Sequence, residues 1–291
     1  MCADCPDSAV LPAAFSAFYT GIFGERWPQL VSAMRRDEPK IPFTEGLEKP
    51  YYLSAASVAA ASALLADTAE IPQDNPVRIL DLCAAPGGKT LVLASGMKGN
   101  WELVANEYSA ARRNRLCHVL DEHLPPDRRS RIRVTGFDGA KWCRYERACF
   151  DFILLDAPCS AERHVLADNT ALSRWTPARV RNLAVRQWSL LSGAWLLLRP
   201  GGRLVYSTCA LAPAENSGVV ERLCKKYPGS RISFPADGFF SRQPLSALTP
   251  EFCSAGVRFL PDRSAGSGPI FFSVLDKPPE PANGPAKNTG V

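Results

Sequence analysis

The sequence predicts an α/β protein in which helices cover both faces of a doubly wound, mainly parallel sheet. Beyond residue 78, apolar runs of strand length alternate with longer segments of helical periodicity, a pattern typical of parallel sheets. The apolar run over 79–82 passes directly into a glycine-containing loop. Of the 291 residues, 46% are apolar and 22% charged, which is an ordinary globular composition. One large α/β domain, or such a domain with a small appendage, accounts for this length.

The first 70 residues are predicted to form a mainly helical N-terminal extension that contributes to RNA binding. Spaced apolar residues indicate helices over 8–23 and 27–34. A proline-rich stretch indicates a loop over 39–50, and a run of small apolar residues indicates a third helix over 51–66.

Residues 71–277 are predicted to form the main domain. Its strands are expected over 78–82, 101–106, 131–135, 150–155, 203–207 and 269–275. Its helices are expected over 89–97, 110–123, 177–198 and 214–227. Residues 278–291 are rich in Pro and Gly, and we expect them to be a disordered tail.

The charge distribution favours a polyanionic partner and excludes a membrane protein. The chain carries 34 Lys and Arg against 29 Asp and Glu, for a net charge of +5, and its basic residues include six arginines within 172–203, a segment without acids. The first nine residues contain Asp4 and Asp7 but no basic residue, unlike a signal or transit peptide. The uncharged stretch over 51–66 has 16 residues, too few to span a bilayer. We therefore expect a cytoplasmic protein.

Ten cysteines in a chain of this kind are expected to be reduced thiols. Cys2 and Cys5 form a CxxC pair, but no second pair or histidine cluster follows at the spacing of a zinc site. The sequence predicts no metal centre.

The segment ILDLCAAPGGKT at 79–90 indicates a cofactor cradle, because an apolar strand runs into a glycine-containing loop and then a helix N-terminus. A phosphate-binding GxxxxGK[ST] motif would need glycine at Cys83, and GxGxxG is also absent. Glu107 lies 20 residues beyond Gly87 (107 − 87 = 20), where a carboxylate can accept hydrogen bonds from a ribose. The alternative is a structural turn with a solvated Glu107.

Two cysteines follow the carboxyl ends of two neighbouring predicted strands. Cys159 stands in LLDAPCS together with Asp156, and Cys209 stands in YSTC. In a doubly wound sheet the carboxyl ends of neighbouring strands line one crevice, so these side chains are expected to face the cofactor loop. A single cysteine there is more often a buried apolar residue, whereas a pair on the cofactor side favours a reactive site.

LDLCAAPGGKT, LLDAPCS and VYSTCALAPAEN, in this order, resemble motifs of the Nop/Sun (Fmu) family of S-adenosylmethionine-dependent RNA cytosine-5 methyltransferases. The resemblance covers roughly residues 45–275. It implies a Rossmann-like methyltransferase fold, S-adenosyl-L-methionine as cofactor and RNA as substrate, with ribosomal RNA expected first and transfer RNA as the alternative. The turn after Cys159 is similar to the branch that contains mitochondrial ribosomal-RNA and tRNA methylases.

The resemblance also implies roles for single residues. Cys209 corresponds to the nucleophile, Cys159 to the cysteine that assists product release, and Asp156 to an acid that contacts cytosine and cofactor. Glu107 corresponds to the ribose-binding acid and Asp138 to the acid beside adenine. The implied cofactor loop consists of Cys83, Ala84, Ala85, Pro86, Gly87, Gly88 and Lys89.

The arginine-rich segment is the candidate RNA-binding face. Arg174, Arg179 and Arg181 are expected to contact phosphates, with Trp175 and Trp188 available to stack on bases. For the helix over 177–198 the alternative is a sheet-covering role with its apolar residues in the core; these are Trp188, Leu191 and Trp195.

Three other hypotheses about function and partners follow. An accessory protein or the ribosomal subunit is a possible further partner for RNA recognition. A non-catalytic RNA-binding assembly factor would not need both Cys159 and Cys209. A nicotinamide-dependent dehydrogenase is disfavoured by the missing GxGxxG motif.

Overall fold

A mixed nine-stranded sheet forms the centre of the computed structural model, which describes residues 11–66 and 76–280. The strand order is β5-β4-β3-β6-β7-β11-β10-β9, and β8 pairs with β11. The strands are β3 (Arg78–Asp81), β4 (Glu102–Asn106), β5 (Ile132–Thr135), β6 (Phe150–Asp156), β7 (Leu198–Thr208), β8 (Arg231–Ser233), β9 (Glu251–Cys253), β10 (Gly256–Phe259) and β11 (Ile270–Asp276). The pairs among β3 to β7 are parallel, whereas β11 pairs antiparallel with β7.

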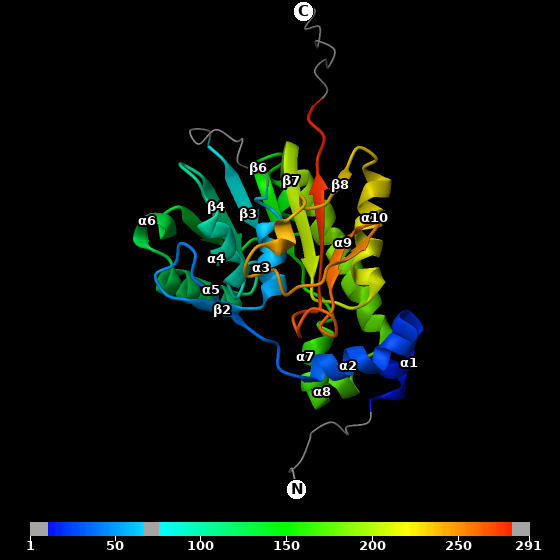
Figure 1. The fold of residues 1–291 in the computed structure, drawn as a ribbon. Helices are drawn as coiled ribbons and strands as arrows, with labels where there is room; N and C mark the ends of the chain where they lie inside the picture. Colours follow the sequence, from blue (N-terminus) through cyan, green and yellow to red (C-terminus); the bar gives the residue numbers. More distant parts are fainter. Residues whose placement is uncertain (1–10, 67–75, 281–291) are drawn as a thin grey trace, which may run out of the picture.

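Helices cover both faces of this sheet (Figure 1). Alternate strand residues point to opposite faces: Ile79 belongs to the core on one face and Leu80 to the core on the other. The helices on the first face are α3 (Ala55–Ser62), α4 (Gly88–Ser95) and α5 (Ala110–His123), and those on the second are α9 (Pro177–Leu197) and α10 (Ser217–Lys226). The predicted fold class is confirmed.

The N-terminal helices pack against the main sheet's carboxyl-end elements. Figure 1 shows α1 (Ala13–Phe23) and α2 (Trp27–Arg35) beside α7 (Glu162–Ala167) and α8 (Asn169–Ser173), at the end of the sheet opposite the C-terminus. Phe15, Tyr19 and Trp175 share one core cluster there, and the rings of Phe15 and Trp175 are 5.0 Å apart. The predicted base-stacking role of Trp175 is therefore wrong, because only 5% of it is exposed.

The region before β3 departs from the sequence prediction. Part of the expected loop forms β1 (Ile41–Phe43), which pairs antiparallel with β2 (Tyr51–Leu53). The helix predicted over 51–66 begins only at α3, after Ser54, whose hydroxyl accepts a hydrogen bond from the Ser57 N–H at the helix N-terminus. The paired residues of β1 and β2 lie eight or more positions apart in the chain, so a local apolar pattern does not reveal that they pair.

The other predicted strands and helices of the main domain are found, with boundaries shifted by a few residues. Leu191 and Trp195 are buried, and Trp188 is partly buried beneath the Arg222 guanidinium, 4.4 Å from its ring, so the sheet-covering alternative for this helix is confirmed. Several predictions lie wholly or partly outside the described residues: the start of the first helix at 8–10, Cys2 and Cys5, the domain boundary at 70, and residues 281–291 of the tail.

Two arginines fasten the N-terminal helices to late segments of the chain. Arg26 forms ion pairs with Glu251 at 2.5 Å and Asp262 at 2.6 Å. Arg163, at the start of α7, donates to the backbone carbonyls of Arg36 at 2.9 Å and Gly266 at 2.8 Å. These contacts hold the N-terminal segment over the carboxyl ends of the parallel strands. Within 11–66 and 76–280, no helix is both long and apolar enough to cross a membrane.

Candidate active site

The loop between β3 and α4 lies where the strand order reverses, because β3 pairs with β4 on one side and β6 on the other. Ligands of doubly wound sheets bind at this position. Gly87 has φ of 121°, and a Cβ on it would lie 2.9 Å from Val119 Cγ1. A Cβ on Gly88 would lie 2.7 Å from the Tyr51 ring. The two glycines thus give the loop a tight path between α5 and β2.

The loop contributes to a cavity of about 190 Å³. Its walls include Asp81 at the end of β3, Asp156 at the end of β6, and Tyr51 and Tyr52 from β2. Of the predicted cofactor residues, Cys83, Ala84, Ala85, Pro86, Gly88 and Lys89 line it together with Asp156. Glu107 and Asp138 are not among its lining residues. Burial raises the pKa of the Cys83 thiol, which therefore stays protonated.

The two outlying acids follow the adjacent strands. Glu107 follows β4, is almost fully buried, and accepts a hydrogen bond from the Ser109 N–H at 2.9 Å. Its other carboxylate oxygen lies 3.1 Å from an Arg112 nitrogen. Asp138 follows β5, accepts from the Ala140 N–H at 3.1 Å, and pairs with Lys141 at 3.3 Å. The predicted cofactor acids are thus spread along the carboxyl edge of three strands.

Lys89 connects the cofactor loop to the strand that carries the first cysteine. Its Nζ donates to Asp156 Oδ2 at 2.9 Å. Burial lowers the pKa of Lys89, but the charge and hydrogen bond of Asp156, together with Asp81 and other nearby acidic groups, outweigh that effect, so the pKa of this amine lies above its ordinary value. Lys89 is therefore a fixed positive charge between the two halves of the site.

Asp81 is a site residue that the sequence analysis missed. It is 1% exposed, and its Oδ2 accepts a hydrogen bond from Thr90 Oγ1 at 2.7 Å. Burial raises the pKa of Asp81 to about 7, and its buried Oδ1 has no hydrogen-bond partner within 11–66 and 76–280. The signal available in the sequence was an acid at the end of the first parallel strand. An unpartnered buried oxygen facing a cavity is the kind of group that a polar ligand satisfies.

The two predicted cysteines meet at the ends of β6 and β7. The Sγ atoms of Cys159 and Cys209 are 3.0 Å apart. The hydrogen bond with Cys209 and burial both raise the pKa of Cys159, which keeps this thiol protonated. Cys209 lines a second cavity of about 200 Å³. Lys89 and Asp156 line both cavities, so the cysteine pair and the cofactor loop belong to one continuous site.

Residues from outside the parallel sheet close this second cavity. Glu38 and Ser57 come from the N-terminal region, and Arg163 and His164 come from α7. Sequence reasoning missed them, because they reach the site through the packing of the N-terminal helices and no motif contains them. The predicted RNA contacts Arg174, Arg179 and Arg181 are exposed at the end of α8 and the start of α9, and do not line the cavity.

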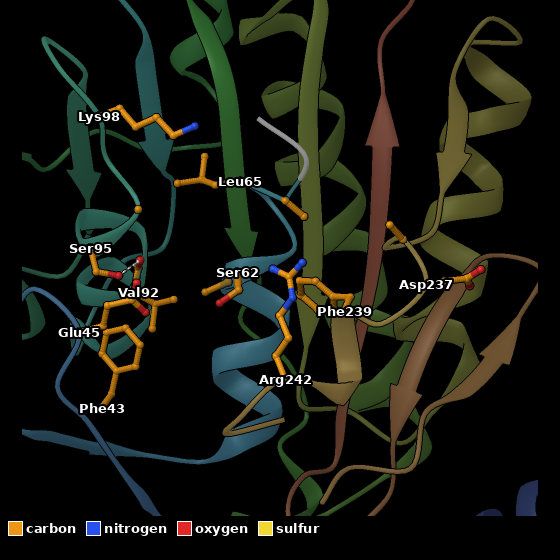
Figure 2. A pocket seen from close by; sticks show the side chains of 14 residues that line it. Phe43, Glu45, Ser62, Leu65, Val92, Ser95, Lys98, Asp237, Phe239 and Arg242 are labelled. Atoms are coloured by element: carbon orange, nitrogen blue, oxygen red, sulfur yellow. Dashed lines mark hydrogen bonds between the residues drawn. The ribbon is translucent and has the colours of Figure 1, made fainter. Parts of the chain in front are cut away.

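A third cavity, of about 350 Å³, lies between α3, α4 and residues 236–242 (Figure 2). Figure 2 shows Arg242 beside Phe239, with Glu45 on the opposite wall. Two basic side chains, Lys98 and Arg242, are balanced by the acids Glu45 and Asp237. The cavity therefore carries no charge preference, and none of its lining residues belongs to either cysteine loop.

A profile of the family described as 16S rRNA methyltransferase RsmB/F matches residues 68–273. The chain belongs to this family. It is 38% identical over 209 residues to ribosomal RNA small subunit methyltransferase F of Erwinia tasmaniensis, covering 71% of this chain and 42% of that protein. It is 36% identical over 242 residues to 5-cytosine rRNA methyltransferase NSUN4 of Bos taurus, covering 79% of this chain and 60% of that protein. The chain thus spans less than two thirds of these relatives.

Solved structures agree with the fold. NSun6 from Pyrococcus horikoshii with SFG superposes with a TM-score of 0.58 and 27% identity, over 81% of this chain and 54% of that one. A methyltransferase homolog protein from Pyrococcus horikoshii gives a TM-score of 0.64 at 21% identity, over 90% and 94% of the two chains. Among the residues described here, no group of three or more metal-ligating side chains is found.

Proposed function

We propose that this protein is an RNA cytosine-5 methyltransferase that uses S-adenosyl-L-methionine and acts through a covalent adduct with Cys209. The observation that carries the proposal is the 3.0 Å approach of the Cys159 and Cys209 sulfurs beside the Lys89–Asp156 pair. Membership of the RsmB/F family supports methyl transfer to RNA as the reaction class. An apolar packing role would not require two thiols in contact beside a polar cavity that one of them lines.

The chain's residues fit the cofactor. Gly87 and Gly88 let the loop pass close to α5 and β2, where a side chain would collide, and Asp81 Oδ1 offers an acceptor that no described residue satisfies. Glu107 would hold the ribose and Asp138 would lie toward the adenine, with the backbone of 83–89 along the amino-acid part. When bound, S-adenosyl-L-methionine supplies the methyl group.

Cytosine carbon 5 is a weak nucleophile, and Cys209 overcomes this weakness. The Cys209 thiolate forms a bond to carbon 6, which makes carbon 5 electron-rich enough to take the methyl group. The Asp156 carboxyl group, as the proton donor to ring nitrogen 3, stabilises the negative charge that develops on the base, while its Oδ2 is held by Lys89. Water beside Cys159 takes up the carbon 5 proton, and the electron pair left behind restores the ring double bond and expels Cys209 as a thiolate. Cys159, 3.0 Å from Cys209, assists this release.

The target base reaches the cavity from single-stranded RNA or after flipping out of a helix. We favour ribosomal RNA as the substrate, because both relatives described above are named rRNA methyltransferases. Transfer RNA is the second candidate. The exposed Arg174, Arg179 and Arg181 would bind phosphates near the entrance, and an accessory protein or the ribosomal subunit would supply further specificity.

The decisive experiment incubates the purified protein with radiolabelled S-adenosyl-L-methionine and either small-subunit rRNA or a pool of tRNA. Cys159→Ala should accumulate a covalent protein–RNA species, visible as a shifted band on a denaturing gel, because elimination is slowed. Cys209→Ala should neither methylate nor form the band, while still binding cofactor. The double variant should lose the band.

Cys143→Ala is the matched control, because Cys143 is a partly buried cysteine away from both strand ends. It should methylate normally. Radiolabel in tRNA and not in rRNA would show that tRNA, and not rRNA, is the substrate. Cofactor binding and RNA binding without methylation of either RNA would support the non-catalytic assembly factor, and a band with Cys209→Ala but not with Cys159→Ala would reverse the two roles.

A further inference from the structure

Two glutamates lie buried directly behind the cysteine loops. Glu162 begins α7, after the Cys159 loop, and Glu215 lies in the short helix η3 (Pro213–Glu215), after the Cys209 loop. Both are 0% exposed. Ser160, next to Cys159, contacts Oε1 of each glutamate through its single hydroxyl. Buried carboxylates are costly unless donors surround them, so the hydrogen bonds of this group decide its charge.

Every partner of Glu162 is a donor. Its Oε1 accepts from the Tyr19 hydroxyl of α1 and contacts the Ser160 hydroxyl, and its Oε2 accepts from the Leu211 N–H at 3.0 Å. Leu211 lies two residues beyond Cys209. Oε1 of Glu162 thus has two hydroxyl partners, and Glu162 fastens the Cys209 loop through a backbone N–H.

Glu215 has a different set of partners. Its Oε2 accepts from the Ser160 N–H at 3.0 Å and from Gln187 Nε2 at 2.8 Å. Its Oε1 contacts only the Ser160 hydroxyl among the described residues. Glu215 thereby fastens the Cys159 loop, while Glu162 fastens the Cys209 loop, and Ser160 joins the two glutamates.

Counting hydrogens shows that one of the two glutamates must share a proton with Ser160. The Ser160 hydroxyl has one hydrogen but touches two carboxyl oxygens. If Ser160 donates to Glu162, its contact with Glu215 is favourable only when Glu215 Oε1 carries a proton and donates to Ser160 Oγ. Burial, with the charge of Glu162, raises the pKa of Glu215 to about 7, which is consistent with this arrangement.

We propose that Glu162, Ser160 and Glu215 are positioning residues for the cysteine pair, and that one proton shared between Glu215 and Ser160 keeps the two loops in contact. This role rests on the proposed function, since it serves the approach of Cys159 to Cys209. The other titratable groups around the two glutamates are Tyr19 and Tyr206, which interact with Glu215, and Cys159, which interacts with Glu162. Burial raises the pKa of both tyrosines, so they remain neutral donors.

The proposal predicts a direction with pH. A raised carboxyl pKa means that the stabilising contact is complete at low pH and is lost as the pH rises through about 7. Above that pH two carboxylates face one hydroxyl, and the loops separate. Glu215→Gln should remove this dependence, because its amide N–H donates to Ser160 at every pH. Glu162→Gln should weaken the contact between the two cysteine loops at every pH. Its amide N–H2 would face the hydrogen-bond donors that the carboxylate now accepts from.

The spacing of the sulfurs can be measured without any methylation. The full chain is equilibrated in glutathione redox buffers at pH 6 and pH 8.5, and the Cys159–Cys209 disulfide is quantified by mass spectrometry of the linked peptides. Disulfide formation consumes two thiols and reduces oxidised glutathione, so its equilibrium constant reports how well the fold holds the sulfurs together. The equilibrium constant of each variant is divided by that of the unmodified protein at the same pH. This ratio cancels the thiol ionisation that is common to both proteins.

Glu162→Gln should lower the equilibrium constant about tenfold at both pH values, equivalent to about 30 mV. Glu215→Gln should match the unmodified protein at pH 6 and exceed it several-fold at pH 8.5. Glu221→Gln, the same change on the exposed surface of α10, should have no effect. If Glu162→Gln does not fold, Tyr19→Phe removes one donor and should give a smaller loss, of about threefold.

Equal effects of the two glutamine variants, or a Glu215→Gln ratio independent of pH, would overturn the proposal. The outcome is separable from the proposed function. The expected asymmetry in a protein that methylates no RNA would refute the methyltransferase while retaining the positioning role. If the protein methylates RNA but the two glutamine variants change the disulfide equilibrium equally, the methyltransferase function is supported and the positioning role is refuted.

Discussion

The Glu107 carboxylate is paired with the Arg112 guanidinium, whose second terminal nitrogen donates to the Ala85 carbonyl at 2.7 Å. The acid that follows β4 is thereby connected to the loop that follows β3. An acid with this support is already held in place, so the ribose contact that we propose for Glu107 would require no conformational change.

We therefore expect Glu107→Ala to raise the dissociation constant for S-adenosyl-L-methionine about tenfold or more, through loss of charge-assisted hydrogen bonds. Calorimetric titration measures this constant directly. Arg112→Ala, which leaves the carboxylate in place, should have a smaller effect. An unchanged constant for Glu107→Ala would remove this residue from the site.

Arg174, Arg179 and Arg181 are predicted to bind RNA phosphates. Replacing all three with Ala should weaken RNA binding irrespective of sequence and flatten its salt dependence by roughly 0.7 to 0.9 per lost contact. Binding isotherms at several salt concentrations give this slope. Arg231→Ala, which alters an exposed arginine on β8, is the control. If the triple variant has the same salt dependence as the unmodified protein, these arginines do not contact RNA and are solvated surface residues.

Trp175 is expected to act on stability and not on RNA. Its ring packs against Phe15, Phe18 and Tyr19, so Trp175→Ala should lower the free energy of unfolding by about 3 to 5 kcal/mol. Chemical denaturation measures the loss, and Arg174→Ala, the exposed neighbour, should change stability by less than about 0.5 kcal/mol. A stable Trp175→Ala protein with impaired RNA binding would restore the stacking interpretation.

Asp81 should make stability depend on pH. Its pKa is raised to about 7 in the folded protein, so its contribution is complete below the ordinary pKa near 4 and is lost as the pH rises through about 7. Between these values one such group changes the free energy of unfolding by about 1.4 kcal/mol per pH unit. Asp81→Asn should remove that slope.

Denaturation of both proteins at pH 5, 6, 7 and 8 provides the comparison. Because Glu215 titrates in the same range, only the difference between the Asp81→Asn and unmodified curves isolates Asp81. Parallel curves would show that the Asp81 carboxyl group does not titrate between those values.

The sequence predicted the parallel part of the sheet well, because apolar runs such as that of β3 are followed by clear helical patterns. It missed β8, β9 and β10, which have three or four residues each and are not followed by an α-helix. The pairing of β1 with β2 was also missed, since it depends on contacts that a local pattern does not contain.

The candidate site divides in the same way. The meeting of Cys159 and Cys209 was predictable, because strand order brings the ends of β6 and β7 together. Glu162 and Glu215 were not, because their importance arises from burial and from Tyr19, which lies 143 positions from Glu162. Charge and motif can be read in a sequence, whereas the partners of a buried carboxylate depend on the completed fold.

The hydrogen bond from Tyr19 to Glu162 bears on how members of this family can exchange parts. A segment that only recognised substrate could be replaced by a different recognition segment without harm to the chemistry. Here the first helix supplies a donor to a carboxylate behind Cys159 and Cys209, so its replacement would leave that carboxylate without one of its hydrogen-bond donors. Recombination or engineered swapping at the start of the main sheet should therefore preserve the first helix along with the cysteine loops.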